Sequence, residues 1–342
     1  MHAYHPPLEG RRDFLRLDFN ENVRGCSPKV IEALRTIDAH EIATYPEYTK
    51  FHERLAQFVG LPVKNVLPTN ASDEGILTVF QTYLDAGDEV LLPVPTFAMF
   101  RFYAELLDLN LKTLLYNKDL SFPGPQLVKA IGKKTRCVVL VNPNNPTGSR
   151  IDRSVIQKVL KKMGQRLVLL DEAYVEFSGE TALDLIQAYK NLVILRTFSK
   201  SFGLAGLRLG MVLSHADNIA NMSKAHSPYS ISTVTTRLAA AALDDTWSVT
   251  QYAREIARSK EMLLSALQEM KIKTFPSHAN FILAAYGERS KQTEAALRKR
   301  GILVRDRSSD PLLKGCLRMT LGPVEETRRL IDALKEIEAS HG

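Results

Sequence analysis

The sequence contains few cysteines. There are three among 342 residues, Cys26, Cys137 and Cys316, and no two of them have the C-x-x-C spacing. A disulfide framework needs an even set of cysteines and zinc sites commonly space their ligands closely, so the pattern favours neither. We interpret the three thiols as packing residues and expect no metal site.

Long apolar runs are also missing. No segment approaches the roughly 18 consecutive apolar residues of a membrane-spanning helix. Residues 1–13 carry histidine, proline and arginine where a signal peptide would have its apolar centre. The sequence therefore predicts a soluble, cytoplasmic protein with no membrane partner.

A third absence is that of concentrated positive charge. The formal net charge is +7, but basic residues are scattered in pairs such as Arg11-Arg12 and Lys161-Lys162. Proteins that bind single strands interleave a basic groove with aromatic side chains, and no stretch of this sequence has that pattern. The charge suits an anionic partner, but we interpret it mainly as a solvated surface and expect no nucleic-acid partner.

From about residue 47 the chain alternates helical periodicity with short apolar runs. Phe51, Leu55 and Phe58 follow helical spacing before Gly60, a residue suited to end a helix, and another helix is predicted from Ser72. Short apolar runs separated by helices are typical of strands buried on both faces of a mostly parallel sheet. The predicted strands are residues 65–67, 89–93, 111–116, 136–141, 166–170 and 192–195.

The pattern changes beyond about residue 245. A long helix (246–270) is followed by shorter elements: a strand at 280–285, a helix at 291–299, strands near 302–304 and 316–320, and a helix from 324. Mixed short elements of this kind indicate a smaller α+β domain. We predict three parts: an N-terminal segment (1–40) that joins the small domain, a large α/β domain (41–244), and the small domain itself (245–342).

Polar residues follow directly after four of the predicted strands. Ligands bind beyond the carboxyl ends of the strands in open α/β sheets, so these stretches form the candidate site. They are residues 69–74, 142–148, 171–174 and 197–200.

Two of these residues carry opposite charges suited to one cofactor. Lys200 at a strand end can be partly desolvated and so made nucleophilic toward an aldehyde, although a lone lysine is more often a surface residue. Asp171 follows four apolar residues and needs a partner if buried. A helix cap or a metal ligand would also explain it, but no suitably placed histidine supports a metal. If the partner is the pyridine nitrogen of pyridoxal phosphate, Asp171 keeps that nitrogen protonated and the ring becomes an electron sink.

The remaining strand-end residues suit the rest of that cofactor. Asn145 and Tyr174 can hydrogen-bond its phenolic oxygen, and Phe97 can stack on its ring or be an ordinary core aromatic. A helix N-terminus binds phosphate through its backbone N–H groups, and a hydroxyl and a guanidinium can add to it. The predicted phosphate site consists of Ala71, Ser72, Asp73, Ser199 and Arg208.

The order and spacing of three stretches resemble the class I and II aminotransferases of fold type I. These stretches are Asn-Asn-Pro-Thr-Gly (144–148), Asp-Glu-Ala-Tyr (171–174) and the run from Thr197 to Gly210. The resemblance implies a pyridoxal-phosphate-dependent transaminase with Lys200 as the Schiff-base lysine. It also implies a mostly parallel central sheet covered by helices on both faces, plus a smaller α+β domain. Reading Gly203, Gly206 and Gly210 as a nucleotide-binding loop fails, because such a loop belongs to the first βα turn.

Within that family the chain most resembles the histidinol-phosphate branch, on residues 3–7, 18–22, 44–47, 303–306 and 315–320. The resemblance implies that histidinol phosphate and 2-oxoglutarate are interconverted with imidazole-acetol phosphate and glutamate. It further implies a homodimer with shared active sites, in which Tyr45 reaches the neighbouring subunit's cofactor phosphate. The implied substrate-binding residues are Tyr4, Asn22, Arg305 and Arg318.

Charge is consistent with that branch. A phosphate monoester suits two guanidiniums, while Arg318 alone could hold the carboxylate of glutamate. Arg305 could instead be a surface arginine paired with Asp306.

The chain departs from the family at Val23, where proline is common, and at Asn70, where glycine is frequent. An aromatic-amino-acid aminotransferase, a threonine-phosphate decarboxylase and a non-catalytic regulator remain alternatives, although a regulator would need an additional N-terminal DNA-binding domain.

Overall fold

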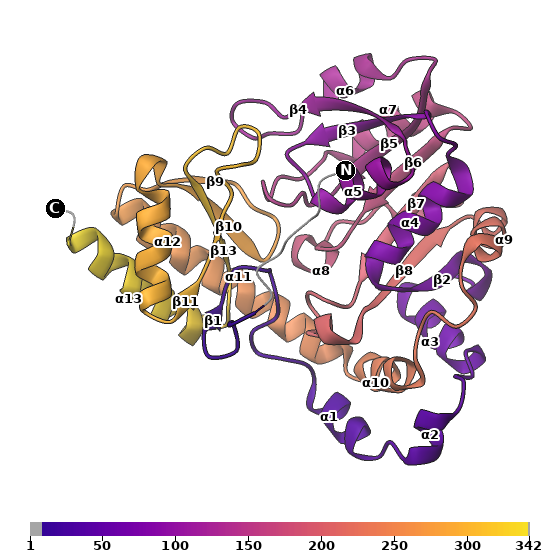
Figure 1. The fold of residues 1–342 in the computed structure, drawn as a ribbon, viewed down its shortest axis with the longest axis horizontal. Helices are drawn as coiled ribbons and strands as arrows, with labels where there is room; N and C mark the ends of the chain where they lie inside the picture. Colours follow the sequence, from indigo (N-terminus) through magenta and orange to yellow (C-terminus); the bar gives the residue numbers. More distant parts are fainter. Residues whose placement is uncertain (1–8, 341–342) are drawn as a thin grey trace.

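The computed structural model describes residues 9–340, which form a large lobe built on one sheet and a smaller lobe beside it (Figure 1). The large sheet has seven strands in the order β2-β8-β7-β6-β5-β3-β4. Strands β4, β3, β5, β6 and β7 run parallel, and β8 is antiparallel to both of its neighbours. The strands are β2 (Val66–Asn70), β3 (Glu89–Val94), β4 (Asn110–Leu115), β5 (Thr135–Val141), β6 (Leu167–Asp171), β7 (Leu192–Thr197) and β8 (Leu209–Ser214). The predicted fold class is confirmed.

The strand order contains a switch point. The chain leaves β3 toward β4 on one side, then crosses back to place β5 on the other side of β3 and continues through β6 and β7. Loops that follow β3 and β5 therefore diverge and leave space at their carboxyl ends, which is where ligands bind in sheets of this type. The candidate residues after β5, β6 and β7 all lie at this edge.

Both faces of the sheet are covered by helices. Along β5, Val138 and Leu140 join one apolar cluster while Cys137 and Val139 join the other, as the two-residue repeat of a strand requires. The first cluster includes α1 (Pro28–Arg35), α3 (Thr49–Val59), α6 (Gly124–Ala130), α7 (Arg153–Met163) and α10 (Thr233–Leu243); the second includes α4 (Ala71–Tyr83), α5 (Ala98–Leu106) and α9 (Ala216–Ala225).

One strand differs from its predicted environment. The expectation that every apolar run is buried on both faces is wrong for β4, whose residues are all exposed or half-buried. Strand β4 is the edge of the sheet and has a neighbour on one side only, so it has less to pack against.

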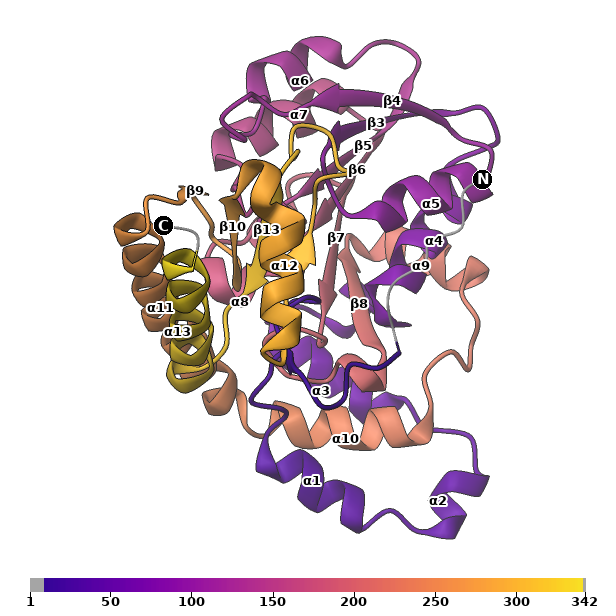
Figure 2. The same ribbon diagram turned by 60° about the vertical axis from the view of Figure 1, so that its left-hand side comes forward.

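The small lobe is built on an antiparallel sheet with the order β12-β13-β10-β9. Its apolar cluster joins these strands to the long helix α11, which lies along the side of the lobe with α13 (Figure 1). Turned to the side, α12 lies over the sheet (Figure 2). The elements are α11 (Thr246–Glu269), β9 (Lys273–Phe275), β10 (Phe281–Ala285), α12 (Ser290–Lys299), β12 (Arg305–Asp306), β13 (Cys316–Thr320) and α13 (Val324–Ala339).

The N-terminal segment touches both lobes. Strand β1 (Leu15–Arg16) pairs with β11 (Ile302–Leu303) of the small lobe. Helix α1 instead buries Val30 in the large lobe's core, and α2 (Ala39–Ala43) follows it below α10 (Figures 1 and 2). The stretch between β1 and α1 therefore passes between the lobes. None of the helices among residues 9–340 has the length and apolarity needed to span a bilayer.

Candidate active site

Asp171 and Lys200 come from neighbouring strands of the large sheet. Asp171 is the last residue of β6 and is 3 % exposed. Lys200 follows the end of β7, which pairs with β6 in parallel register. Because parallel strands end at the same edge of a sheet, the carboxylate and the amine lie in one site and influence each other's charge.

The amine of Lys200 is poised for chemistry near neutral pH. Its Nζ donates a hydrogen bond to the backbone oxygen of Phe19 at 2.9 Å. Burial, and after it the positive charge of Arg318, lower the pKa of Lys200 to about 8. A substantial fraction of the amine is therefore neutral at physiological pH, as a nucleophile or a base requires.

Asp171 lies in surroundings that suit a cationic partner. Burial raises the pKa of Asp171 to about 7, and the hydrogen bond from the Ala173 backbone N–H, at 2.9 Å, opposes this rise. A buried carboxylate is costly unless a positive group neutralises it. The protonated ring nitrogen of pyridoxal phosphate is such a group, so this environment fits the cofactor.

Tyr174 and Asn145 each keep a donor available. The Tyr174 hydroxyl accepts a hydrogen bond from Asn20 Nδ2 at 2.9 Å, so its own O–H can still donate. Asn145 Oδ1 accepts from Arg318 Nη1 at 2.5 Å, which orients the Asn145 amide and leaves its NH₂ group to donate. Two donors of this kind suit the anionic phenolic oxygen of the cofactor.

The first turn of α4 forms an anion cradle. No side chain caps this helix; the Ala71 N–H donates to the Arg208 backbone oxygen at 2.8 Å, and the N–H groups that follow it in the first turn suit an anion. A Cβ atom on Gly210 would lie 2.4 Å from the Ser72 nitrogen, so only glycine lets β8 pass so close. Arg208 Nη2 pairs with Asp73 Oδ2 at 2.8 Å, which brings a guanidinium to the same turn. The cradle fits the cofactor phosphate.

Left-handed backbone in this turn occurs at Ala71, not at Asn70. Ala71 has φ of 62° and Asn70 has φ of −73°. An L-residue pays about 1–2 kcal/mol for the left-handed conformation, and glycine does not. The position at which glycine would relieve strain is therefore residue 71.

We expect Ala71→Gly to stabilise the cofactor-free protein, by roughly 1 kcal/mol after the extra freedom of glycine in the unfolded chain is subtracted. Urea denaturation measures the free energy of unfolding. The matched control is Ala98→Gly, because Ala98 is the exposed first residue of α5 and is outside the left-handed region. That variant should lose stability, and an equal loss in both variants would contradict the strain at Ala71.

Arg305 and Arg318 lie side by side on the small lobe. They are directly paired across β12 and β13, so their side chains project from the same face of that sheet. Arg318 is 5 % exposed and also donates through Nη2 to the Asp18 backbone oxygen. Arg305 is half-buried with its guanidinium 5.8 Å from the Phe19 ring centre, and that ring belongs to the segment that contacts Lys200.

The other predicted residues are distributed around this centre. Asn22 donates to the Ser201 backbone oxygen at 3.0 Å, directly beside Lys200. Ser199 is buried at the end of β7, and Phe97 is half-buried before α5 with its ring against Phe100. Tyr45 is 77 % exposed and does not reach this centre within one chain. Tyr4 lies outside the described residues.

Sequence reasoning missed Asn20 and Arg307. Asn20 holds the Tyr174 hydroxyl, and its backbone N–H donates to Thr320 Oγ1 at 3.0 Å. Arg307 pairs with Asp310 at 2.6 Å, and its positive charge opposes the rise that burial causes in the pKa of Tyr174. The polar stretch at 18–22 is a signal that could have found Asn20, whereas nothing in the local sequence separates Arg307 from a surface arginine. Within residues 9–340 no group of three or more His, Cys, Asp or Glu side chains could hold a metal ion.

Known proteins agree with this geometry. The family model described as aminotransferase class I and II matches residues 12–334. The chain is 35 % identical over 327 residues to the histidinol-phosphate aminotransferase of Caldanaerobacter subterraneus subsp. tengcongensis, covering 94 % of this chain and 92 % of that protein. The enzyme of the same name from Symbiobacterium thermophilum is 37 % identical over 335 residues, or 95 % and 91 % of the two chains.

A solved structure gives the same result. Histidinol-phosphate aminotransferase from Sinorhizobium meliloti, in complex with pyridoxal-5'-phosphate, superposes with a TM-score of 0.87 at 25 % identity and covers 96 % of this chain and 92 % of that one. The chain therefore belongs to the class I and II aminotransferases, which are pyridoxal-phosphate-dependent transaminases of fold type I.

Proposed function

We propose that this transaminase interconverts histidinol phosphate and 2-oxoglutarate with imidazole-acetol phosphate and glutamate. The curated relatives above bear the name of that activity. The observation in this chain that carries the proposal is the pairing of Arg305 with Arg318 across β12 and β13, beside the segment that contacts Lys200. Two guanidiniums on one sheet face suit a phosphate monoester, which carries more charge than a single carboxylate.

The same two arginines can serve both half-reactions. Arg318 is anchored by Asn145 and by the Asp18 backbone, so its position is set before the substrate arrives. Arg305 is less buried and can adjust to a larger anion. We infer that Arg318 holds the carboxylate of glutamate and that both hold the phosphate of histidinol phosphate.

The cofactor, when bound, supplies the aldehyde that captures the amino group and the ring that withdraws electrons from the substrate Cα. The chain's own residues do the rest. Asp171 keeps the ring nitrogen protonated, Tyr174 and Asn145 donate to the phenolic oxygen, and the first turn of α4 with Arg208 holds the phosphate. Lys200 moves the proton from the substrate Cα, because its lowered pKa makes it a base near neutrality.

We also propose that two copies form a homodimer with shared active sites. Exposed apolar side chains lie on α1, on α2 and just beyond α2, and on the loop after α9. Tyr45, just beyond α2, and Tyr229, in the loop after α9, have their ring centres 4.5 Å apart. Exposed patches of this kind mark interaction surfaces. The particle mass in solution tests the proposed dimer.

The three free cysteines are compatible with a reducing compartment such as the cytoplasm.

The test is a comparison of substrates in the wild type and in Arg305→Ala. We expect turnover of histidinol phosphate to exceed that of phenylalanine, and the variant to lose roughly 10- to 100-fold in kcat/KM for histidinol phosphate, the cost of a charged hydrogen bond, with a smaller loss for glutamate. Steady-state kinetics of each half-reaction measures this.

The control is Arg298→Ala, which removes an exposed arginine of the same lobe and should change neither substrate. Equal losses for both substrates in Arg305→Ala would remove the proposed phosphate contact. Faster turnover of phenylalanine would favour the aromatic aminotransferase, and release of carbon dioxide from threonine phosphate would favour the decarboxylase.

A further inference from the structure

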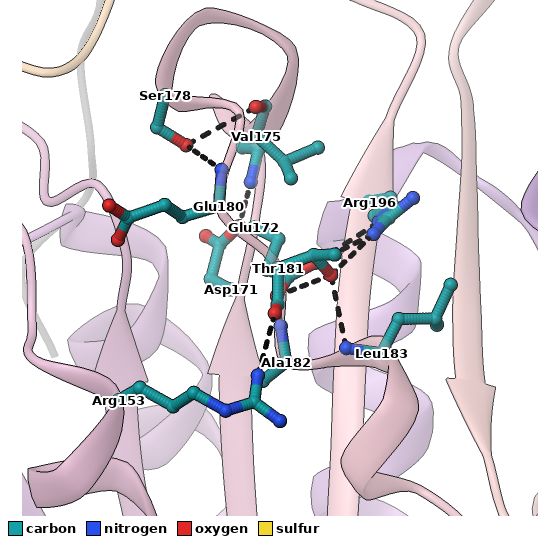
Figure 3. A network of polar contacts seen from close by, with 11 residues as sticks. Arg153, Asp171, Glu172, Val175, Ser178, Glu180, Thr181, Ala182, Leu183 and Arg196 are labelled. Carbon is teal, nitrogen blue, oxygen red and sulfur yellow. Dashed lines mark hydrogen bonds and ion pairs between the residues drawn. The ribbon is translucent and has the colours of Figure 1, made fainter.

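A polar network with a buried centre lies at the ends of β6 and β7 (Figure 3). Its centre is the ion pair between Glu172, which is fully buried, and Arg196, which is 8 % exposed. The two guanidinium nitrogens Nε and Nη2 of Arg196 reach Glu172 Oε2 at 3.1 and 2.9 Å. Thr181 joins both partners, because its Oγ1 accepts from Arg196 at 2.7 Å and donates to Glu172 Oε2 at 2.8 Å.

The network connects the ends of β6 and β7, which carry Asp171, Tyr174 and Lys200. Glu172 follows Asp171 in the chain and precedes Tyr174, so one carboxylate holds the segment that bears both residues. Arg196 lies in β7 just before Ser199 and Lys200. The backbone agrees with the side chains, since the Glu172 N–H donates to the Leu195 oxygen at 2.9 Å.

Glu172 also closes the loop that follows the site. The Ala182 backbone N–H donates to Glu172 Oε1 at 2.7 Å, so the chain returns to the carboxylate after passing through Tyr174 and α8 (Val175–Ser178). The loop holding Tyr174 is thus anchored at both ends on one side chain. Loss of the hydrogen bonds to Glu172 would therefore displace Tyr174 and Asp171 together relative to Lys200.

The Glu172–Arg196 pair also affects the charges of the neighbouring carboxylic acids. The Glu172 carboxylate adds to the rise that burial causes in the pKa of Asp171. Burial also raises the pKa of Glu176 to about 7, and Arg196 opposes that rise. Arg196 is therefore the cation that balances two buried carboxylic acids directly behind the site.

We propose that Glu172 and Arg196 are positioning residues that set Asp171 and Tyr174 against Lys200 for amino-group transfer. This inference rests on the proposed roles of those three residues. Glu172 and Arg196 are buried and paired with each other, so we expect their effect to be on the chemical step and not on substrate binding.

The test uses Arg196→Met, Glu172→Gln and the double variant, each loaded with pyridoxal phosphate. We expect kcat to fall roughly 10- to 100-fold in all three with KM for glutamate little changed, because misplacement of about 1 Å has that cost. The pH titration of the bound cofactor's visible absorbance provides a second readout. Its midpoint should rise by roughly 1 pH unit in Arg196→Met and fall by a similar amount in Glu172→Gln, since a nearby charge shifts a pKa by that amount.

The double variant separates position from charge. Its titration midpoint should return toward the wild-type value because no net charge has been removed, while its kcat stays low because the bridge between β6 and β7 is gone. Thr181→Val is a milder variant that keeps both charges, and it should lower kcat by less. Arg153→Met is the control, because Arg153 donates to the Thr181 backbone oxygen at 3.2 Å from the exposed side of the same loop.

Two outcomes would overturn the inference. One is that every folded, cofactor-saturated variant has wild-type kcat and a wild-type absorbance titration, in which case the network only stabilises the fold. The other is a loss confined to KM. If the wild type itself takes up no cofactor, the proposed function fails instead, so the two failures are distinguishable.

Discussion

Replacement of Lys200 by alanine is expected to abolish transamination and the Schiff-base absorbance of the bound cofactor together. In the proposed function this amine is the nucleophile that meets the cofactor aldehyde and the base that moves the substrate proton. Loss of a general base alone costs roughly 10²- to 10⁴-fold in rate, and loss of the covalent attachment adds to it. Absorbance after soaking in pyridoxal phosphate measures formation of the Schiff base. Borohydride reduction measures the covalent attachment, and kcat measures the loss of the base.

The matched control for that experiment is Lys260→Met. Burial lowers the pKa of Lys260 to about 8 as well, but this amine lies on α11 and donates to the Ser277 backbone oxygen at 2.9 Å. Lys260 thus has a lowered pKa but does not lie beside Asp171, so Lys260→Met should leave the transaminase activity unchanged. Full activity in Lys200→Ala, or loss of cofactor absorbance in Lys260→Met but not in Lys200→Ala, would disprove the role of Lys200.

Asp171→Asn is expected to reduce kcat by roughly 10²- to 10³-fold, the scale of one preorganised electrostatic contact. Asparagine cannot keep the ring nitrogen protonated, so the ring withdraws electrons less strongly. The cofactor's dissociation constant, measured by absorbance titration, should rise as well because a buried ion pair is lost. Activity within a few-fold of wild type would disprove the contact.

The same variant has a predicted stability profile without cofactor. Burial raises the pKa of Asp171 to about 7 in the folded chain, above the ordinary value of 3.8, so the folded state holds the proton more tightly. Stability from this group is therefore complete below the ordinary pKa and is lost as pH rises toward 7. Cofactor-free Asp171→Asn should match the wild type near pH 4 and exceed it at pH 8, as measured by denaturant unfolding. With cofactor bound the order should reverse, because the ring nitrogen compensates the carboxylate.

Local sequence sufficed for six of the seven strands of the large sheet and for the residues at its edge. Apolar runs such as 136–141 and 166–170 are short, buried and separated by helices, and this pattern is specific for parallel strands. Each run is followed by its polar residues in sequence, so the pattern alone places Asp171, Asn145 and Lys200 at one edge. Strand β8 was missed, because its glycine-rich approach from Gly203 to Gly210 resembles a loop.

Contacts made by backbone atoms could not be found in this way. Lys200 donates to the Phe19 oxygen and Arg318 to the Asp18 oxygen, and a carbonyl has the same chemistry in every residue. The left-handed conformation of Ala71, beside the close approach of β8 at Gly210, is likewise a property that local sequence does not reveal.

The sequence by itself determined the fold class, the family and the edge of the sheet at which the candidate residues lie, because hydrophobic periodicity and motif order are local properties of the chain. Only the tertiary structure decided how the lobes meet. Asn20 reaches Tyr174, Arg318 reaches Asn145, and Glu172 pairs with Arg196 across two strands. These contacts join residues that are distant in sequence. Burial raises the pKa of Asp171 and lowers that of Lys200, and it arises only when the chain has packed around these two side chains.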